Sequence, residues 1–499
     1  MDTHIKILKN TDTLFHKAGY VPMSEYVDDI KHMKNNGTWK LPLGLGDRLQ
    51  IILSEVFIRF SWLQEILYIA YPYPWSPSYN ILLSYLSRKG VFNKVMEKNE
   101  PYAGYYSFFI TKKMFNGRIL SGQGISKSPS IAMSKAIGEM LERYISGYND
   151  KNRNITYESF EEISKVCTVV YPPMYHRFLP VQKKLYKELD AHPSEKINWV
   201  EGHNLITKEK TYIPKQLTSW FFLNEKKEKV VSSFTSSGGA LYFTKEGATL
   251  RAILEVINRD GFLVHWLTKT SPRMIISDTL PKELQDMIRM FTQRGLSIYV
   301  VDVTSLAVPS VCVFAISEQI DTPRIAMSGA SATSFFDAIY SALEEMVLSG
   351  EALHSNKKAF KDFRTWKGDE FLFEVTKEDR QFFWTGRETI ERFEWFVQGE
   401  RVSYQDITKG DLLYGIDDKL KLEACLTKIA SIGDGYSPIV YYPENKLQQK
   451  LGFYIAQVFI PKAFPFYLSE KYGMFDSERL KDFTKFKEVR VNKDPHMFS

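Results

Sequence analysis

The chain has 499 residues, of which 44% are hydrophobic and 14% are aromatic, so it carries enough apolar surface to fold and is not disordered as a whole. Its 65 basic and 59 acidic residues leave a formal charge of +6, an average field too weak to imply a nucleic-acid partner. The three cysteines, Cys167, Cys312 and Cys425, lack paired spacing, which excludes a zinc site of clustered cysteines and favours a reducing compartment.

The N-terminal region indicates a cytoplasmic protein. Residues 1–10 lack the continuous apolar core and the small-residue cleavage site of a secretory signal. The most apolar long window, residues 51–75, is interrupted by Glu55, Arg59 and Glu65, so it falls short of the roughly 20 apolar residues that a membrane span requires. We therefore expect a soluble, cytoplasmic protein that has no membrane partner.

Residues 1–100 are predicted to form a helical N-terminal extension. Apolar residues recur at three- and four-residue steps along residues 47–71, the spacing of one helix face. These residues are Leu49, Leu53, Val56, Phe57, Phe60, Leu63 and Leu67. A breaker-rich stretch follows at residues 71–77. Such a stripe is typical of core packing, and the alternative is that it docks on a partner.

Residues 101–499 are predicted to form one mixed α/β domain. Strand-like runs at residues 296–303 and 308–315 alternate with long helical stretches. The charged and aromatic segment 357–406 is predicted to contain strands and a helix. Residues 446–461 are predicted to form a further strand region because their second half is strongly β-prone.

A loop of small residues precedes an alanine-bearing helix three times. The predicted loops lie at residues 122–124, 237–239 and 328–330, and the helices that follow them at 131–144, 247–259 and 336–347. The helices carry matching glutamates, Glu139, Glu255 and Glu345, which are spaced too widely for a solenoid. The pattern predicts recurring loop–helix units around a shared cleft.

The first of these helices carries two carboxylates on one face. Glu139 and Glu142 stand at i and i+3, and Arg143 lies four residues after Glu139, so these side chains are neighbours on the helix surface. Adjacent carboxylates repel unless a cation lies between them, and Mg2+ prefers such oxygen ligands and bridges them to phosphates. Taken alone, the segment fits either a magnesium site or a solvated face with one surface ion pair.

The second helix repeats this pattern. Glu255 and Arg259 have the same four-residue spacing, and Glu246 lies nine residues before Glu255. The preceding segment 234–240 is rich in hydroxyls and glycines, which let backbone amides approach an anion at a helix N-terminus, and segment 122–128 is similar. Neither contains a Walker motif or a dinucleotide fingerprint. Two such segments, each feeding an acidic helix, predict a site for phosphate and metal.

Other candidate sites are disfavoured. His176, His203 and His265 have no metal or protease spacing and are predicted to be structural or surface residues. The sequence contains no Gly-x-Ser-x-Gly nucleophile elbow. The cysteines have apolar or small neighbours, which is typical of buried, inert thiols.

The ordered motifs of the chain resemble those of the YcaO family. In chain order they are Gly122-Gln123-Gly124, Gly138-Glu139-Met140-Leu141-Glu142-Arg143-Tyr144, Trp199-Val200-Glu201-Gly202, Ser236-Ser237-Gly238, Glu255-Val256-Ile257-Asn258-Arg259-Asp260, Asp302-Val303-Thr304, Val308-Pro309, Gly329-Ala330, Ala342-Leu343-Glu344-Glu345 and Ile460-Pro461. The resemblance begins near residue 105 and leaves the first hundred residues uncovered. It implies a mixed α+β domain in which loop–helix units pack on β-sheets around an ATP cleft.

The resemblance also implies an activity. Family members similar to this chain use ATP and Mg2+ to convert Cys, Ser or Thr of a ribosomally made precursor peptide into thiazoline or oxazoline rings. The implied partners are the precursor peptide, a leader-binding subunit that resembles ubiquitin-activating enzymes, and a flavin dehydrogenase. Two alternatives fit the same residues: thioamide formation with an external sulfur donor, and a non-catalytic scaffold or peptide-binding subunit that keeps the fold.

The resemblance assigns roles to individual residues. Magnesium would be held by Glu139, Glu142 and Glu255, and the nucleotide would be contacted by Ser236, Glu246, Arg143, Arg259 and Lys127. The chain tail, residues 495–499, resembles a Pro-His-Pro-Phe-Pro ending that reaches the active site in ring-forming members. The resemblance therefore implies a catalytic role in proton transfer for the Ser499 carboxylate.

The chain departs from the family pattern at several positions. Lys135 replaces a serine, Ser237 replaces an asparagine, Asn258 replaces the second glutamate of the Glu-x-x-Glu-Arg motif, and Leu348 and Gly350 replace a glutamine and an arginine after Glu345. The last change removes a phosphate contact, whereas Asn258 would still offer a metal an uncharged oxygen. These changes motivate the scaffold alternative.

Overall fold

The computed structural model describes residues 77–98, 104–114, 119–149, 154–218, 228–233, 235–317, 325–352, 371, 373, 375, 380, 383–384, 387–412 and 417–498. These residues fall into two compact units. The first contains the described residues up to 149 together with Leu241–Thr244 and Glu444–Tyr454, and the second contains the rest. The predicted helix at residues 47–71, with its packing or docking face, lies outside the described residues.

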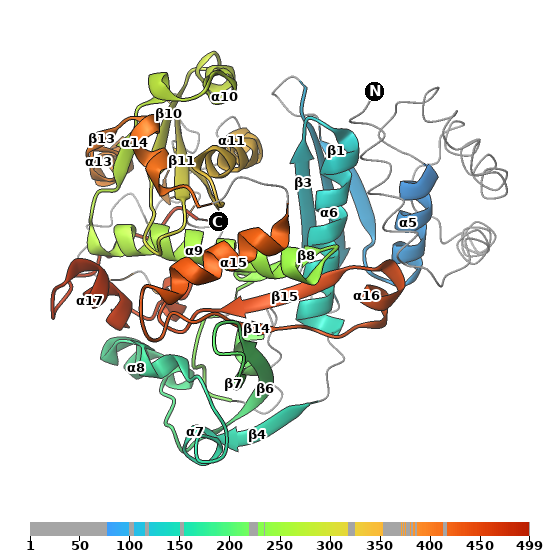
Figure 1. Cartoon of the computed structure of the whole chain (residues 1–499), viewed down its shortest axis with the longest axis vertical. Helices are drawn as coiled ribbons and strands as arrows, with labels where there is room; N and C mark the ends of the chain where they lie inside the picture. The colour runs from blue at the N-terminus through green and yellow to red at the C-terminus, as the bar shows by residue number, and fades with distance from the viewer. Residues whose placement is uncertain are drawn as a thin grey trace. The chain divides into compact units, whose positions relative to one another are not determined.

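The first unit is built on a three-stranded antiparallel sheet. Its order is β1 (Lys94–Lys98), β2 (Tyr106–Lys113) and β3 (Ile119–Ser126). Helix α6 (Pro129–Tyr144) lies along β3 and passes directly into a π-helical turn, Ile145–Asn149 (Figure 1). Helices α5 (Pro77–Arg88) and α16 (Lys446–Leu451) complete the unit. The helix predicted at residues 131–144 is thus confirmed.

The first predicted loop is wrong, because Gly122-Gln123-Gly124 lies inside strand β3. Residues 122 and 124 point to the same face of the strand. A Cβ atom at Gly122 would lie 2.4 Å from the Ala136 carbonyl oxygen, and one at Gly124 would lie 2.1 Å from the Ala132 carbonyl oxygen. The glycines therefore allow α6 to approach the strand closely, which is a packing role and not a phosphate loop.

The second unit contains a five-stranded sheet in the order β12-β11-β10-β9-β13. Its strands are β9 (Arg273–Ile275), β10 (Leu296–Asp302), β11 (Ser310–Ser317), β12 (Ile325–Ser331) and β13 (Arg401–Val402). All pairs are antiparallel except β13 with β9. Strands β10 and β11 confirm the two strand-like runs. The predicted third loop, 328–330, is wrong because these small residues belong to β12.

A six-stranded sheet has the order β4-β6-β14-β15-β8, with β7 paired to β6. Its strands are β4 (Ile155–Ser159), β6 (Lys196–Asn204), β7 (Lys210–Pro214), β8 (Gly239–Tyr242), β14 (Ile439–Tyr441) and β15 (Tyr454–Phe459). A separate pair joins β5 (His176–Arg177) to β16 (Asp476–Ser477).

The strand region predicted at residues 446–461 is correct only in its second half. Strand β15 occupies that half, whereas residues 446–451 form α16. The side chain of Asn445 accepts the Leu447 N–H over 2.9 Å and so caps the helix, which ends at Gly452 with a φ of 66°. The cap, the left-handed glycine end and the helix-forming leucine, lysine and glutamine residues between them explain why this half is a helix.

The second unit has one long central helix and several shorter ones. They are α7 (Phe160–Ile163), α8 (Pro180–Leu185), α9 (Lys245–Thr268), α10 (Lys282–Thr292), α11 (Phe335–Ala352), α13 (Arg387–Glu394), α14 (Tyr404–Ile407), α15 (Asp418–Ala430) and α17 (Glu478–Thr484). Helices α9 and α11 confirm the second and third predicted helices, and α9 continues nine residues beyond the predicted end because its second half is apolar and buried. Helix α13 and strand β13 lie in the segment for which a helix and strands were predicted.

Helix α9 is buried in an aromatic core. Phe262 and Trp266 lie on this helix. Trp384 and Phe396, on either side of α13, and Phe498 pack against them. Burial of one such side chain contributes about 1.5–3 kcal/mol relative to leaving it exposed. Phe498 is therefore part of the core of this unit.

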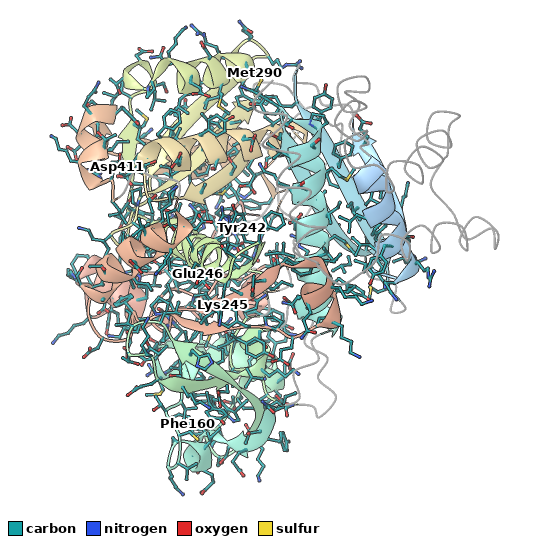
Figure 2. All side chains as sticks on the ribbon, turned by 45° about the vertical axis from the view of Figure 1, so that its right-hand side comes forward. Phe160, Tyr242, Lys245, Glu246, Met290 and Asp411 are labelled. Atoms are coloured by element: carbon teal, nitrogen blue, oxygen red, sulfur yellow. The ribbon has the colours of Figure 1, made fainter. Side chains whose placement is uncertain are left out.

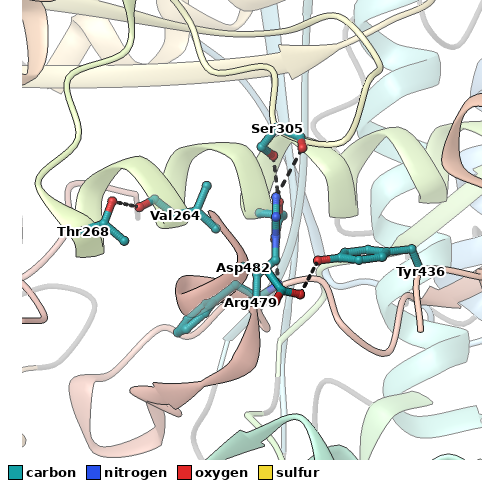
Figure 3. A network of polar contacts seen from close by, with 8 residues as sticks. Val264, Thr268, Ser305, Tyr436, Arg479 and Asp482 are labelled. Atoms are coloured by element: carbon teal, nitrogen blue, oxygen red, sulfur yellow. Dashed lines mark hydrogen bonds and ion pairs between the residues drawn. The ribbon is translucent and has the colours of Figure 1, made fainter. Parts of the chain in front are cut away.

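A buried ion pair fixes the middle of α9. The Asp260 carboxylate accepts hydrogen bonds from Arg479, over 2.6 Å from Nη2, and from the Phe464 N–H and the Ser305 hydroxyl, each over 2.7 Å. Figure 3 shows Arg479, which also donates to the Ser305 carbonyl. It also shows the Tyr436 hydroxyl, which donates to the Asp482 carboxylate. These bonds hold two loops against the helix one residue after Arg259.

Buried neutral histidines support the structural interpretation of this residue type. His176 bonds the Ser477 hydroxyl over 2.7 Å and the Pro461 carbonyl over 3.0 Å, so its Nε2 is the donor to that carbonyl. Burial lowers the pKa of His176 and of His265 to about 4, and burial raises the pKa of Cys425 to about 12. Within the part of the chain that the structure describes, no helix is long and apolar enough to cross a membrane.

The glycine contacts predict opposite effects for two alanine substitutions. Gly124→Ala would force backbone atoms of α6 and β3 apart, and we expect a loss of about 1–3 kcal/mol in the free energy of unfolding. Gly138→Ala, at a helix position where the nearest neighbour is Leu241 Cδ2 at 3.8 Å, should gain about 0.5–1 kcal/mol. Urea denaturation measures both, and equal stability of Gly124→Ala and the natural chain would contradict the packing role.

The histidines predict a loss of stability in mild acid. Unfolded histidine titrates near pH 6.5, so between about pH 6.5 and 4 the unfolded state binds more protons than the folded state, and stability falls as the pH falls. Between pH 7.5 and 5, His176 should account for about 2 kcal/mol of this loss. His176→Gln should reduce the pH dependence of the urea midpoint by that amount, with exposed His203→Gln as the matched control. An unchanged pH dependence in His176→Gln would contradict the assignment.

Candidate functional site

The Glu139 carboxylate is held by two donors of the first unit. Arg143, one turn later on α6, places Nη2 2.6 Å from Glu139 Oε1, and the backbone N–H of Gln123 donates to Oε2. Arg143 also donates through Nη1 to the Ser121 carbonyl over 2.7 Å. Each carboxylate oxygen therefore has a fixed donor, while the side chain keeps 26% of its surface exposed.

The position of β3 explains why this pair forms. β3 is the last strand of the order β1-β2-β3, so the peptide groups on its outer edge need partners other than a strand. Glu139 supplies an acceptor and Arg143 a donor to that edge, which α6 can reach because Gly122 and Gly124 let it approach. The packing of helix on strand thus orients the carboxylate.

Glu255 on α9 makes the same two kinds of contact. The backbone N–H of Gly238 donates to Glu255 Oε2 over 3.2 Å, and Arg259 Nη2 lies 3.5 Å from Oε1. Gly238 has a φ of +82°, and a Cβ atom there would lie 2.3 Å from the Val458 carbonyl oxygen, so only glycine fits. The four-residue spacing of glutamate and arginine predicted for both helices thus gives the same kind of ion pair in each unit.

Aromatic rings cover the other side of Arg259. Its guanidinium carbon lies 4.0 Å from the ring centre of Phe498 and 5.4 Å from that of Phe466, which are cation–π distances. Phe498 is the penultimate residue of the chain. The tail therefore contacts the arginine that pairs with Glu255.

A small cavity of about 50 Å3 lies beside Arg259. Its polar wall consists of Ser232, Ser233, Thr235 and Ser237, and its apolar wall of aliphatic and aromatic side chains. The hydroxyls of Ser232 and Ser237 have no hydrogen-bond partner among the described residues. The cavity has room for a few water molecules and not for a nucleotide.

The other predicted residues are less closely grouped. Glu142 is buried on α6, next to Arg143 in the chain. Glu246 is exposed on the first turn of α9 (Figure 2), and helical geometry places it about 13 Å along the axis from Glu255 and half a turn around it. The structure therefore brings Glu255 together with Arg259 but not with Glu246.

Two further nucleotide-binding candidates lie in the segments before α6 and α9. Lys127 is exposed, and its Nζ lies 5.6 Å from the ring centre of Tyr105. Ser236 is partly buried, and its carbonyl accepts the Gly239 N–H over 2.9 Å. Ser499 lies outside the described residues.

A model of the YcaO cyclodehydratase family, described as ATP- and Mg2+-binding, matches residues 122–463, which is more than half of the chain. The chain belongs to the YcaO family. ATP and Mg2+ are the cofactors of this family. No curated protein matches the sequence significantly.

Solved structures of YcaO proteins share the fold. A heterocyclase in complex with substrate and cofactor matches with a TM-score of 0.65 and 16% identity, over 87% of this chain and 57% of the heterocyclase. YcaO from Methanopyrus kandleri bound with AMPPCP and Mg2+ matches with a TM-score of 0.57 and 15% identity, over 78% and 91% of the two chains. A chain of the E. coli microcin synthetase McbBCD complex with pro-MccB17 bound gives 0.52 and 14%, over 81% and 97%. The YcaO chain thus spans little more than half of the first heterocyclase.

Asn258, which departs from the family motif, is a buried link between α9 and β11. Its Nδ2 donates to the Val311 carbonyl over 3.0 Å and to the Ser310 hydroxyl over 3.2 Å, while its Oδ1 accepts from Arg259 Nη1 over 3.2 Å. A carboxylate cannot donate to a carbonyl, so a glutamate here would leave two acceptors facing each other. Asn258 therefore orients Arg259.

The remaining departures lie on α6, on α11 and at the small cavity. Lys135 is exposed, and its Nζ donates to the Ile125 carbonyl over 3.1 Å. Leu348 and Gly350 lie on α11, where Ser349 stands four residues after Glu345. The third helix thus lacks the arginine that α6 and α9 each carry at this spacing.

The donor chemistry of the site fits magnesium. Among the described residues, no group of three or more His, Cys, Asp or Glu side chains comes together in a form that could hold a metal ion by itself. Mg2+ usually takes one or two carboxylates and fills its other positions with water and phosphate oxygens. Glu139 and Glu255 each offer, in their own unit, an oriented, partly exposed carboxylate of the kind that suits an ion arriving with a nucleotide.

Sequence reasoning missed Phe466 and Arg479. Phe466 contacts Arg259, and Arg479 holds the Asp260 carboxylate that follows Arg259 in the chain. No local sequence pattern indicates the role of Arg479, because it lies 219 residues from Asp260 in the chain. The tail motif was a signal that the chain end lies near the site, but it did not identify Arg259 as the contact of Phe498.

Proposed function

We propose that this YcaO protein is an ATP- and Mg2+-dependent cyclodehydratase that forms thiazoline or oxazoline rings from Cys, Ser or Thr of a ribosomally made precursor peptide. The observation that carries the proposal is the repeated contact set of Glu139 and Glu255, each held by a backbone amide and an arginine one turn later. Family membership supports the chemistry.

The reaction requires a better leaving group than the amide oxygen itself. The side-chain thiol or hydroxyl adds to the carbon of the preceding amide, and the oxygen of that amide must then depart as the ring C=N bond forms. Bound ATP supplies the phosphoryl group that lets this oxygen leave as phosphate, so that water is lost overall and ADP remains. Such a transfer depends chiefly on positioning and charge neutralisation.

The residues of the chain would divide these tasks. Glu139, Glu142 and Glu255 would hold Mg2+, and Arg143 and Arg259 would keep two of these carboxylates in place and offset charge that develops on the phosphates. Lys127, Ser236 and Glu246 would contact the rest of the nucleotide, and the Ser499 carboxylate would accept the proton of the attacking group. The exposure of Lys127 and Glu246 supports this role, because both are open to a ligand.

Partners are part of the proposal. A leader-binding subunit that resembles ubiquitin-activating enzymes would deliver the precursor peptide, and a flavin dehydrogenase would oxidise the rings. The microcin synthetase that shares the fold is a complex with pro-MccB17 bound, which supports a precursor peptide and partner subunits.

A non-catalytic scaffold is the second candidate. The buried position of Asn258, whose amide is committed to β11 and Arg259, favours it, because α9 then supplies one carboxylate where the family motif has two. The retained pairs of Glu139 and Glu255 argue for catalysis, since an idle site has no need for two ordered carboxylates.

Nucleotide binding distinguishes the two candidates. A catalytic protein should bind ATP only with Mg2+ present, and Glu139→Gln and Glu255→Gln should each weaken this binding by about tenfold or more because each removes a charged metal ligand. The glutamine keeps an acceptor for the backbone amide. Isothermal titration calorimetry measures the affinity, and exposed Glu161→Gln on α7 is the matched control. Absence of Mg2+-dependent binding would favour the scaffold.

Isotope transfer tests the chemistry itself. A candidate precursor peptide with 18O in the amide before its Cys, Ser or Thr is incubated with the partner subunit, ATP and Mg2+. We expect one 18O atom in phosphate for each ring, together with the loss of one water mass from the peptide. Ring formation with unlabelled phosphate would contradict phosphorylation of the amide oxygen, and phosphate release without water loss would contradict cyclodehydration.

A further inference from the structure

The C-terminal segment is anchored at alternate residues inside the second unit. Hydrogen bonds join Asn492 to Leu267, Asp494 to Trp266, and His496 to Tyr467. The side chains of His496, Met497 and Phe498 are all buried. The tail is thus held along its length, and the last described residue, Phe498, packs on Arg259.

The final anchor is a buried arginine. Arg380 donates through Nη1 to the Phe498 carbonyl over 3.2 Å and to the Tyr467 carbonyl over 3.5 Å. Its Nη2 lies 3.0 Å from Glu470 Oε1, and the side chains of this pair are 0% and 2% exposed. The bond from Arg380 therefore fixes the position of the Phe498 carbonyl.

Stability alone is a poor explanation for this pair. Desolvation of two charges can cost more than their attraction returns, so apolar residues of similar volume often stabilise a core as well or better. Arg380 Nε and Glu470 Oε2 have no hydrogen-bond partner among the described residues, and burial raises the pKa of Glu470 despite the nearby guanidinium. What Arg380 adds is a directed bond to one carbonyl of the tail.

We propose that Arg380, backed by Glu470, is a positioning residue that holds Phe498 against Arg259. The inference rests on the proposed function, in which Arg259 keeps the Glu255 carboxylate in place, and Phe498 is the ring that covers Arg259. Arg380 does not touch Arg259 through its own contacts. It acts through Phe498, whose carbonyl it binds and whose ring covers Arg259.

The Arg380–Glu470 pair is called the clamp, and the test removes both of its charges in one variant. Arg380→Met/Glu470→Met leaves no uncompensated buried charge, and Arg380→Lys keeps the charge but loses the planar fork that reaches Glu470 and Phe498 at once. The control is Arg392→Met, which removes a different tail anchor, the 2.8 Å pair with Asp494. Urea midpoints establish that each variant folds.

Two readouts distinguish positioning from general stabilisation. Carboxypeptidase should release Phe498 about tenfold or more faster from the double variant than from the natural chain or Arg392→Met, and kcat for ATP-dependent ring formation should fall about tenfold or more while the KM for ATP changes less than about twofold. For Arg380→Lys, the release rate of Phe498 and kcat should both lie between the values of the natural chain and those of the double variant. If the double variant does not fold, the release rate of Phe498 and kcat of Arg380→Lys test the proposal by themselves.

Each outcome bears on one claim. Unchanged release of Phe498 in a folded clamp variant overturns the clamp, and equal losses of kcat in Arg392→Met and the double variant overturn its specific role. If the natural chain shows no Mg2+-dependent ATP binding, the proposed function fails, and the carboxypeptidase rates still decide whether Arg380 holds Phe498.

Discussion

A carboxylate held between a backbone amide and an arginine one turn later is the interaction on which the candidate site depends. Glutamate loses roughly 1.5–2 kcal/mol of side-chain conformational freedom when it is fixed in place. Folding already fixes both side chains. The Gln123 amide and Arg143 hold Glu139, and the Gly238 amide and Arg259 hold Glu255. On the proposed function, an ion that binds either carboxylate would find it already ordered, which favours affinity.

The surroundings of Arg259 show how the second unit makes that arrangement rigid. Asp260, the next residue on α9, is held by Arg479, and Asn258, the preceding residue, is bonded to β11. Phe498 covers the guanidinium from the chain end. Three segments that are distant in sequence thus determine one side-chain position, and a departure from the family motif, Asn258, contributes to that order rather than to metal binding.

The sequence predicted what depends on short-range spacing and failed where tertiary packing decides. The i,i+4 pairs of Glu139 and Glu255, the helices that carry them and strands β10 and β11 of the five-stranded sheet follow from local periodicity. Gly122 and Gly124 were misread as a phosphate loop because a glycine that admits a helix and one that admits an anion look alike in sequence. The contact of Phe498 with Arg259 depends on the fold of the whole unit, and no local pattern indicates it.

The two glutamates matter together only if they serve one nucleotide. The most direct measurement is a crystal structure of the chain with a non-hydrolysable ATP analogue and Mg2+. The account predicts that Glu139 and Glu255 both ligate magnesium on the same triphosphate, directly or through water, with Arg143 and Arg259 still paired to them. A triphosphate bound without either carboxylate near its metal ions would contradict it.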